Sequence, residues 1–220
     1  MQLVLASVLS PEDLETLARD LADVVWQDGA RSAGPLARAV KRNRQASSMD
    51  ARVNACGAFV QSALARQDGV QRAMYPVKWS PVLFSRYGPS EHYGAHVDNA
   101  IMGEGQARLR ADIAFTLFLT EPDQYEGGEL VIEGIAGEQA IKLAAGSAFL
   151  YPAFAIHRVE PVRSGERRVA VGWIQSAIRS AEQREILFDL QSVQDGLGRD
   201  HPAALILSRS IAHLLRLWAE

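Results

Sequence analysis

The 220-residue sequence predicts a mainly β protein whose core is flanked by helices on both sides. Between about 73 and 175, short runs of β-branched and aromatic residues are separated at close intervals by Gly, Pro and Asp. Such closely spaced strands are typical of a β-sandwich or barrel, and not of a parallel α/β sheet. Outside this region, apolar residues recur at the spacing of a helix. The two sheets of a jelly roll of this kind can enclose a ligand cavity.

The N-terminal segment, residues 1–77, is expected to contain a strand and supporting helices. Residues 2–9 form the expected strand. Ser10 can then cap a helix, and the proline after it suits the first helical turn. A second helix is expected over roughly 50–66. The basic run at 37–45 lies between the helices and is interpreted as a solvated face, although it could border a substrate entrance.

The β core is expected to span residues 78–177, with strands bounded by turn-forming residues. The expected strands cover 82–87, 113–119, 128–134, 140–146, 147–152, 156–162 and 167–174. The large aromatic residues of this region are interpreted as core and not as a cofactor stack: Trp79, Phe84, Phe115, Phe118 and Phe149. The pair Gly127-Gly128 predicts a tight turn with positive φ, with a role in shape and not in chemistry.

Residues 178–220 are expected to form a C-terminal helical extension. One helix is predicted over 180–197 and a second over 201–219, since the helical period returns in both stretches. The residues of the second helix expected to pack inward are Leu205, Ile211, Leu214, Leu215 and Trp218.

Composition restricts the class of protein. The net charge is −3, which gives no general case for binding nucleic acid or an anionic membrane. A single cysteine, Cys56, excludes an internal disulfide framework and a Cys-rich zinc site. No run approaches the roughly 20 apolar residues of a membrane span, and the N-terminus lacks the positive start of a signal peptide. A cytoplasmic location is therefore expected.

The motif His96-Val97-Asp98 is the first candidate for a functional site. Side chains two apart in a strand lie on the same face, so the imidazole and the carboxylate would enter one space. With 5 His and 26 acidic residues in 220, such a pair is expected about 0.6 times by chance (5 × 26/220). The motif alone therefore fits a solvated strand end as well as a metal site.

A third residue, His157, favours the metal site. It lies in an expected late strand, 61 residues after His96 (157 − 96). Two His and one carboxylate match the facial triad of non-haem Fe(II) oxygenases, which leaves positions on the metal for co-substrate and O₂. The same three ligand types can hold Zn²⁺ for hydrolysis, so the ligands alone leave the metal open.

Arg167, ten residues after His157, favours the oxygenase. A 2-oxoglutarate co-substrate needs a buried cation for its far carboxylate, and Arg offers a planar bidentate donor. A zinc hydrolase has no such need. Arg168 is adjacent and would lie on the opposite face of the strand, and periodicity alone does not say which face is inside.

These motifs resemble those of a known family. They are similar to the prolyl and lysyl hydroxylase-type 2-oxoglutarate oxygenases in "HVD" at 96–98, "GGEL" at 127–130, "LYP" at 150–152, His157 and Arg167. Over essentially its full length the chain resembles the bacterial PKHD-type hydroxylases, which share its "LSPEDL", "TLFL" and "WIQS" segments. The resemblance implies a double-stranded β-helix (jelly-roll) core and an enzyme that uses Fe(II), 2-oxoglutarate and O₂.

The resemblance also implies roles for single residues. His96, Asp98 and His157 would be the catalytic iron ligands, and Arg167, in place of its neighbour, would anchor 2-oxoglutarate. Tyr87, nine before the first histidine, falls where related prolyl hydroxylases have a tyrosine that binds the co-substrate. Thr116, on a neighbouring strand, is a second candidate for that contact. Family members are also associated with L-ascorbate, which re-reduces iron after uncoupled turnover, and with iron uptake.

Two other functions stay open at this point. The chain could be a non-catalytic protein that responds to iron or 2-oxoglutarate through the same pocket, or a Zn²⁺-dependent hydrolase. The substrate of an oxygenase could be a protein side chain, a free amino acid or a siderophore-like small molecule. The Leu-rich last helix could pack on the core or on a second copy, as in a homodimer. The remaining histidines are expected to be exposed or structural: His92, His201 and His213.

Overall fold

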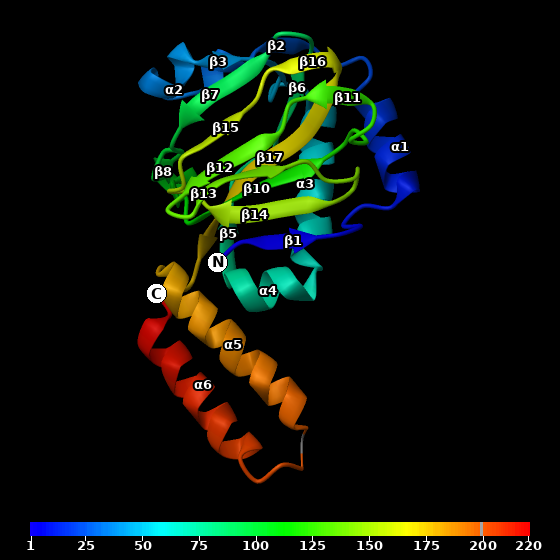
Figure 1. Cartoon of the computed structure of the whole chain (residues 1–220). Helices are drawn as coiled ribbons and strands as arrows, with labels where there is room; N and C mark the ends of the chain where they lie inside the picture. The colour runs from blue at the N-terminus through cyan, green and yellow to red at the C-terminus, as the bar shows by residue number, and fades with distance from the viewer. Residues whose placement is uncertain (199) are drawn as a thin grey trace.

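The computed structural model describes residues 1–198 and 200–220, and its core is two antiparallel sheets that face each other (Figure 1). The large sheet contains, in order, β1 (Leu3–Leu5), β14 (Ala148–Pro152), β10 (Ile113–Phe118), β17 (Arg167–Ser176), β6 (Leu83–Tyr87), β4 (Arg44–Ala46) and β2 (Trp26–Asp28), and β5 (Pro76–Trp79) also pairs with β17. The small sheet contains, in order, β13 (Gly137–Ile141), β12 (Leu130–Gly134), β15 (His157–Val159), β7 (His92–His96) and β3 (Lys41–Arg42). This arrangement confirms the predicted jelly-roll core.

Short elements complete the chain. Two further strand pairs are β11 (Tyr125–Gly127) with β16 (Val162–Gly165), and β8 (Ile101–Met102) with β9 (Leu109–Arg110). The helices are α1 (Pro11–Asp20), α2 (Pro35–Ala39), α3 (Ala51–Ala65), α4 (Asp68–Met74), α5 (Ala181–Leu197) and α6 (Ala204–Trp218), with 3₁₀ turns η1 (Gly29–Ser32) and η2 (Gly105–Ala107). Among the described residues, no helix has the length and apolar character needed to cross a membrane.

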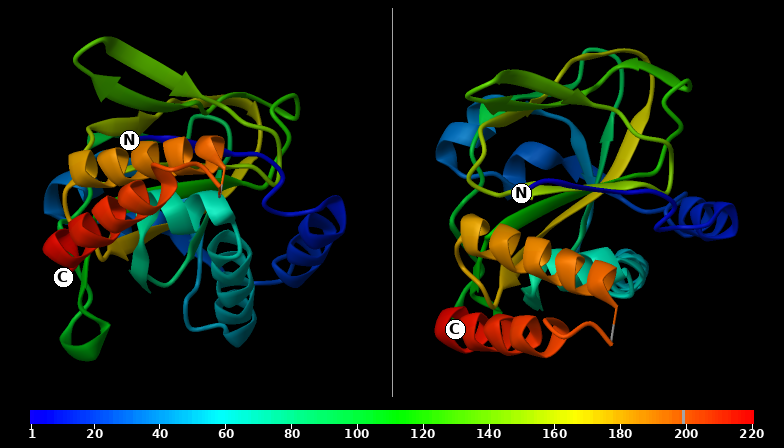
Figure 2. Two further views of the ribbon diagram at one scale, coloured as in Figure 1. Left: turned by 90° about the horizontal axis from the view of Figure 1, so that it is seen from below. Right: turned by 60° about the horizontal axis from the view of Figure 1, so that its bottom comes forward.

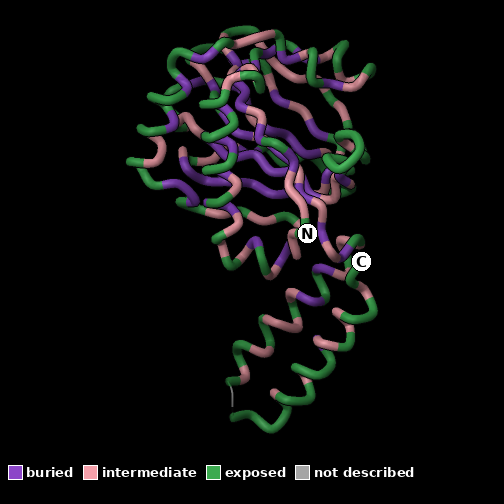
Figure 3. The backbone as a smooth tube through the Cα atoms, turned by 180° about the vertical axis from the view of Figure 1, so that it is seen from behind, coloured by how far each residue is buried: buried purple, intermediate pink, exposed green. Residues whose placement is uncertain are grey.

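The two faces of the large sheet form two separate hydrophobic cores. Alternate residues of β10 point to opposite faces, as strand geometry requires. Ile113, Phe115 and Leu117 pack with the helices α1, α3 and α4 outside the sandwich, whereas Ala114 and Phe118 pack between the sheets. The buried residues are concentrated in the sheets (Figure 3). The aromatic side chains predicted to be core are all packed there, the four phenylalanines fully buried and the tryptophan partly.

The same alternation decides which arginine of β17 faces inward. Arg167 is 1% exposed and shares the inner face with Val169, Val171 and Trp173. Arg168 points outward, where its guanidinium pairs with a glutamate at the surface. The orientation that periodicity left open is therefore the one with Arg167 inside.

Both predicted N-terminal helices, α1 and α3, are present, and each begins directly after a capping side chain. The Ser10 hydroxyl accepts a hydrogen bond from the Asp13 amide (3.2 Å), and the Asp13 carboxylate accepts one from the Ser10 amide (2.9 Å), which closes a capping box at α1. Asp50 caps α3 through one hydrogen bond, which its carboxylate accepts from the Arg52 amide (2.9 Å). Helix α4 was not predicted; it is only seven residues long, and its N-cap residue Gln67 makes no side-chain capping bond.

The prediction that the whole basic run at 37–45 is solvated is wrong for Lys41, Asn43 and Gln45, which are 5%, 4% and 5% exposed. Arg42 and Arg44 are exposed, as expected. The reason is local geometry: the segment is extended, so alternate residues lie on the inner and the outer side. The run therefore has a buried and an exposed side as it passes from β3 in the small sheet to β4 in the large sheet.

The C-terminal helices form a hairpin that extends away from the sandwich (Figures 1 and 2). Ile211 is buried, and Leu214, Leu215 and Trp218 pack around it, as predicted. Leu205 is 80% exposed, so its predicted packing role is wrong; at 100° per residue it lies on the face of α6 away from Leu207, Ile211 and Leu214, which pack toward α5. The hairpin is tied to the core at its end, where Arg110 contacts Glu220 at 2.9 Å.

The boundaries at 77 and 177 stay predictions. In the structure, β1 and β4 extend the large sheet and β3 extends the small sheet, so the N-terminal segment contributes strands to both. It is a structural part of the sandwich as well as its helical cover.

Leu117→Ala is expected to lower the free energy of unfolding by about 2–5 kcal/mol, because this fully buried side chain would leave a cavity between the large sheet and its helices. Chemical denaturation measures the change. Ile135→Ala, at a fully exposed position in the β12–β13 turn, is the control and should change stability by less than about 0.5 kcal/mol. Equal effects of the two variants would contradict this assignment of the core.

Candidate metal and co-substrate site

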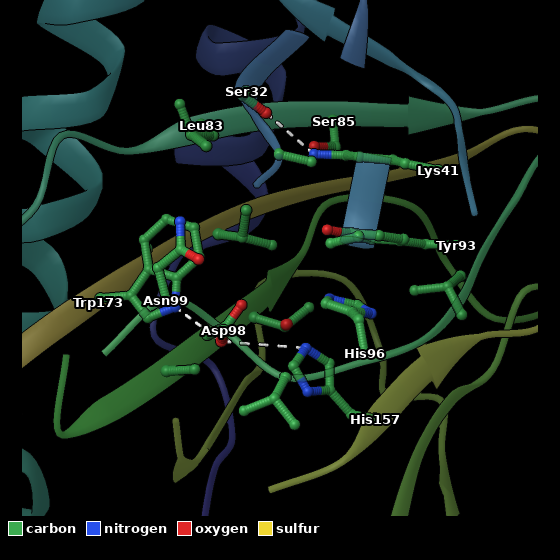
Figure 4. Close-up of a pocket in the computed structure, with 18 of the residues that line it drawn as sticks. Ser32, Lys41, Leu83, Ser85, Tyr93, His96, Asp98, Asn99, His157 and Trp173 are labelled. Atoms are coloured by element: carbon green, nitrogen blue, oxygen red, sulfur yellow. Dashed lines mark hydrogen bonds and ion pairs between the residues drawn. The ribbon is translucent and has the colours of Figure 1, made fainter. Parts of the chain in front are cut away.

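Three potential metal ligands converge between the sheets. His96 is the last residue of β7, and Asp98 follows two residues later in the loop. His157 begins β15, which pairs with β7 so that the two histidines lie opposite each other. One ligand atom from each of the three residues lies within 4.8 Å of the others, a spacing at which one ion could contact all three (Figure 4).

Both imidazole rings are oriented by their own backbone. Nδ1 of His96 donates a hydrogen bond to the carbonyl of Gly94 (2.8 Å), and Nδ1 of His157 donates one to the carbonyl of Ala155 (2.9 Å). A carbonyl only accepts, so Nδ1 of each ring carries a proton. Nε2 is then the ring nitrogen through which each histidine can bind a metal.

Asp98 is held by a residue that the sequence analysis did not select. The indole Nε1–H of Trp173 donates a hydrogen bond to Oδ2 of Asp98 at 2.8 Å. The same oxygen lies 4.0 Å from Nε2 of His157. Trp173 lies on the Arg167 face of β17, so strand alternation could have identified it once the inner face was known.

The electrostatics of the site suit a cation. Burial, with a smaller contribution from His157, lowers the pKa of His96 to about 3, so this ring is neutral at neutral pH. Burial also raises the pKa of Asp98, while His157, the Trp173 N–H and Lys41 act in the opposite direction. Two imidazoles beside a poorly solvated carboxylate form a ligand set that fits Fe(II) or a similar divalent ion.

Arg167 lies in the same cavity with hydrogen-bonding capacity unused. Its guanidinium is buried against the rings of Tyr87 (5.1 Å) and Phe118 (5.5 Å), and its Nε and Nη1 have no partner among the described residues. Buried donors without acceptors are costly and are expected where a ligand completes the site. The residues therefore fit a carboxylate ligand at this end of the cavity.

The two-glycine turn makes room for this arginine. Gly127 and Gly128 both have positive φ, at 72° and 68°, which confirms the predicted turn. A Cβ on Gly128 would lie 3.0 Å from Cδ of Arg167. The turn therefore acts through shape, as expected, because a larger residue would displace the guanidinium.

All six residues selected from the sequence line one cavity of about 320 Å³. They are His96, Asp98, His157, Arg167, Tyr87 and Thr116. Tyr87 is opposite Arg167 in the β6–β17 register, and Thr116 is opposite Val171 in the β10–β17 register. Lys41, from the basic run that could border a substrate entrance, also lines the cavity, and so do Ser85 and Tyr93, which were not selected from the sequence. The other three histidines do not line this cavity.

Comparison with known proteins first defines the class. Residues 82–175 match the family model of the 2OG-Fe(II) oxygenase superfamily. Among solved structures, a Pseudomonas putida prolyl-4-hydroxylase is similar in fold, with a TM-score of 0.55 and 18% identity over 80% of this chain and 92% of that one. HygX from Streptomyces hygroscopicus, solved with nickel and 2-oxoglutarate, has a TM-score of 0.55 and 12% identity, covering 80% and 82%. The fold is that of the 2-oxoglutarate oxygenases.

Full-length relatives then define the family. A PKHD-type hydroxylase of Hyphomonas neptunium is 42% identical over 99% of both chains. One from a Picosynechococcus strain is 45% identical over 97% of both. The chain therefore belongs to the PKHD-type hydroxylases, and it is a 2-oxoglutarate-dependent dioxygenase with Fe(II) as its metal.

Trp173→Phe is expected to weaken divalent-metal binding about 10–100-fold, because Asp98 loses the hydrogen bond that orients it. Anaerobic calorimetry with Fe(II) or Mn(II) measures the dissociation constant. Trp79→Phe is the matched control, since Trp79 packs on the outer core and makes no contact with the triad. Unchanged metal affinity in Trp173→Phe would show that the indole does not position the carboxylate.

Proposed function

We propose that His96, Asp98 and His157 bind the catalytic Fe(II) and that Arg167 binds the far carboxylate of 2-oxoglutarate. One observation carries this assignment: a buried arginine with unpaired donors shares a cavity with a three-ligand cluster. Tyr87 and Thr116, which line the same cavity, are proposed to contact the co-substrate. A zinc hydrolase would leave Arg167 without a role.

When bound, iron and 2-oxoglutarate supply the oxidising chemistry, in which O₂ is consumed, succinate and CO₂ are released and the substrate is hydroxylated. The residues of the chain supply position and environment. The backbone carbonyls orient both imidazoles so that Nε2 of each ring can bind the metal, and the Trp173 indole orients the Asp98 carboxylate. Arg167 orients the co-substrate, and the packed aromatic rings beside it exclude water from the carboxylate contact.

The wider biological assignments are proposals from the family resemblance and the sequence. L-ascorbate is proposed to sustain activity by re-reducing the metal after uncoupled turnover, and a link to iron uptake is proposed with it. The substrate is a small molecule or a protein side chain, and no nucleic acid is involved. Residence in the cytoplasm is proposed from composition. A homodimer is proposed through α6, where Leu205, Ile206 and Leu217 are exposed.

Anaerobic addition of Fe(II) and 2-oxoglutarate to the wild-type protein is expected to give a weak visible charge-transfer band, and admission of O₂ should then yield succinate. His96→Ala should lose the band, and Asp98→Ala should lose turnover, because each removes one of three ligands. Near-normal succinate formation by Asp98→Ala would refute the ligand assignment. If the wild-type protein formed the band but released no succinate with any substrate, the result would favour a non-catalytic binding protein.

Arg167→Ala is expected to weaken 2-oxoglutarate binding about 30-fold or more, which corresponds to about 2 kcal/mol or more for one lost partner of a buried charge pair. The concentration dependence of the charge-transfer band measures this affinity. Arg168→Ala is the matched control, since the adjacent guanidinium lies outside the sandwich. An effect of Arg168→Ala as large as that of Arg167→Ala would refute the anchor assignment.

A further inference from the structure

A second buried cation, Lys41, lies in the cavity apart from Arg167. It belongs to β3 of the small sheet and is 5% exposed. Its Nζ lies 4.9 Å from the ring centroid of Tyr93, and Tyr93 stacks on His96 at 3.6 Å (Figure 4). The ammonium is thus separated from the metal-site imidazole by a single aromatic ring.

The polar groups around Lys41 form a chain with an excess of donors. Nζ donates to the hydroxyl of Ser32 (3.0 Å), and Nε2 of Gln45 donates to the hydroxyl of Ser85 (3.1 Å). The single Ser32 O–H lies in range of two acceptors, Oε1 of Gln45 (2.5 Å) and the Gly29 carbonyl (3.0 Å). We call Lys41, Ser32, Gln45 and Ser85 the Lys41 donor cluster. Two N–H groups of the ammonium and the Ser85 O–H have no acceptor among the described residues. Lys41 and Ser85 both line the cavity, so these donors can serve a ligand there.

The charge of Lys41 also lacks a dedicated partner. Among the described residues, no carboxylate oxygen lies within 4.0 Å of the Lys41 Nζ, the distance limit for an ion pair. Burial lowers the pKa of Lys41 to about 8, with Asp98 and Asp28 acting against this from a distance, so the ammonium form predominates at neutral pH. In the proposed holoenzyme, the metal balances the charge of Asp98, and 2-oxoglutarate balances the charge of Arg167.

We propose that the Lys41 donor cluster binds a carboxylate of the molecule that is hydroxylated. An anion with several acceptor oxygens satisfies both the unmatched charge and the surplus donors, which a neutral hydroxyl or amide does not. This inference rests on the proposed function, because it assigns Arg167 to the co-substrate and leaves Lys41 to the substrate. The carboxylate can belong to a small acid or to a protein side chain.

The test uses protein loaded with Mn(II) and N-oxalylglycine, an analogue that fills the 2-oxoglutarate site without turnover. Binding of ¹³C-acetate near the paramagnetic ion is measured by saturable line broadening, with acetamide as the uncharged equivalent. Acetate is expected to bind at least about tenfold more tightly than acetamide. Lys41→Met should weaken acetate binding at least about tenfold, and Ser85→Ala should weaken it less.

Arg42→Met is the matched control, because Arg42 is the next residue of the same strand and its side chain is exposed. It should bind acetate as the wild type does. N-oxalylglycine affinity should be the same in all variants. A shared loss of N-oxalylglycine binding in Lys41→Met would overturn the proposal, since Lys41 would then belong to the co-substrate. The proposal also fails if wild-type protein shows no saturable acetate binding, or if Lys41→Met binds acetate normally.

Thermal unfolding separates a recognition role from a structural one. Lys41→Met should unfold at the wild-type temperature or above it, because the variant removes a buried charge that lacks an ion-pair partner. A marked fall in the unfolding temperature would overturn the proposal in favour of a structural lysine. A peptide whose only carboxylate is a glutamate side chain then identifies the source: competition with acetate indicates a protein substrate, and its absence a small acid.

These readouts are independent of turnover. Succinate formation by the wild-type enzyme tests the proposed function, whereas acetate binding tests the Lys41 donor cluster. A protein that forms succinate but fails to bind acetate refutes only the further inference.

Discussion

The pairing of β7 with β15 is the contact on which the site depends. It places His96 opposite His157, at the end of one strand and the beginning of the other. The carbonyl that orients each ring comes from two residues earlier in the same chain segment, so ring orientation is built into the backbone. A register shift of one residue would send one imidazole to the other side of the sheet. The ligand geometry is therefore as rigid as the sandwich itself.

The buried charged groups of the cavity also lower the stability of the fold. Two cations are buried there beside the half-buried carboxylate of Asp98, and Arg167 keeps donors without acceptors. Each such group costs about 1–3 kcal/mol when left unsatisfied, an expense that is absent from the apolar cores on either side. Such departures from full hydrogen bonding are expected at a functional site, because the missing partners are supplied by ligands. The extensive helix-covered face of the large sheet offsets this cost.

The six site residues selected from the sequence line one cavity, and the reasons for selecting them were largely local. Ligand types restrict the chemistry, and an arginine lies on a strand ten residues after His157. Periodicity alone did not say which face of that strand is inside; the family resemblance implied Arg167, and the structure places Arg167 inside. Trp173 follows from Arg167 by simple alternation once that face is known. The triad comes together only through tertiary pairing, which the family resemblance supplied and spacing alone did not.

The burial of Lys41 was not predicted because β3 is only two residues long, too short for any periodicity to be recognised. A basic run in a sequence is usually solvated, and only the pairing of β3 with β7 places one of its members inside. Leu205 is the opposite case: it is apolar, but it lies on the face of α6 away from Ile211 and Leu214, which pack toward α5. In both cases burial depends on which side of the element meets its neighbour.

The origin of the cavity walls has a consequence for how such enzymes diversify. Residues 82–175, which define the superfamily match, contain the triad and Arg167, whereas Lys41 comes from a strand that precedes them. On the two proposals made above, the metal and co-substrate ligands come from residues 82–175, whereas three of the four residues of the Lys41 donor cluster precede them. Exchange of the leading stretch would then be expected to change substrate specificity more than the oxidative chemistry, provided that the replacement still supplied strands to both sheets.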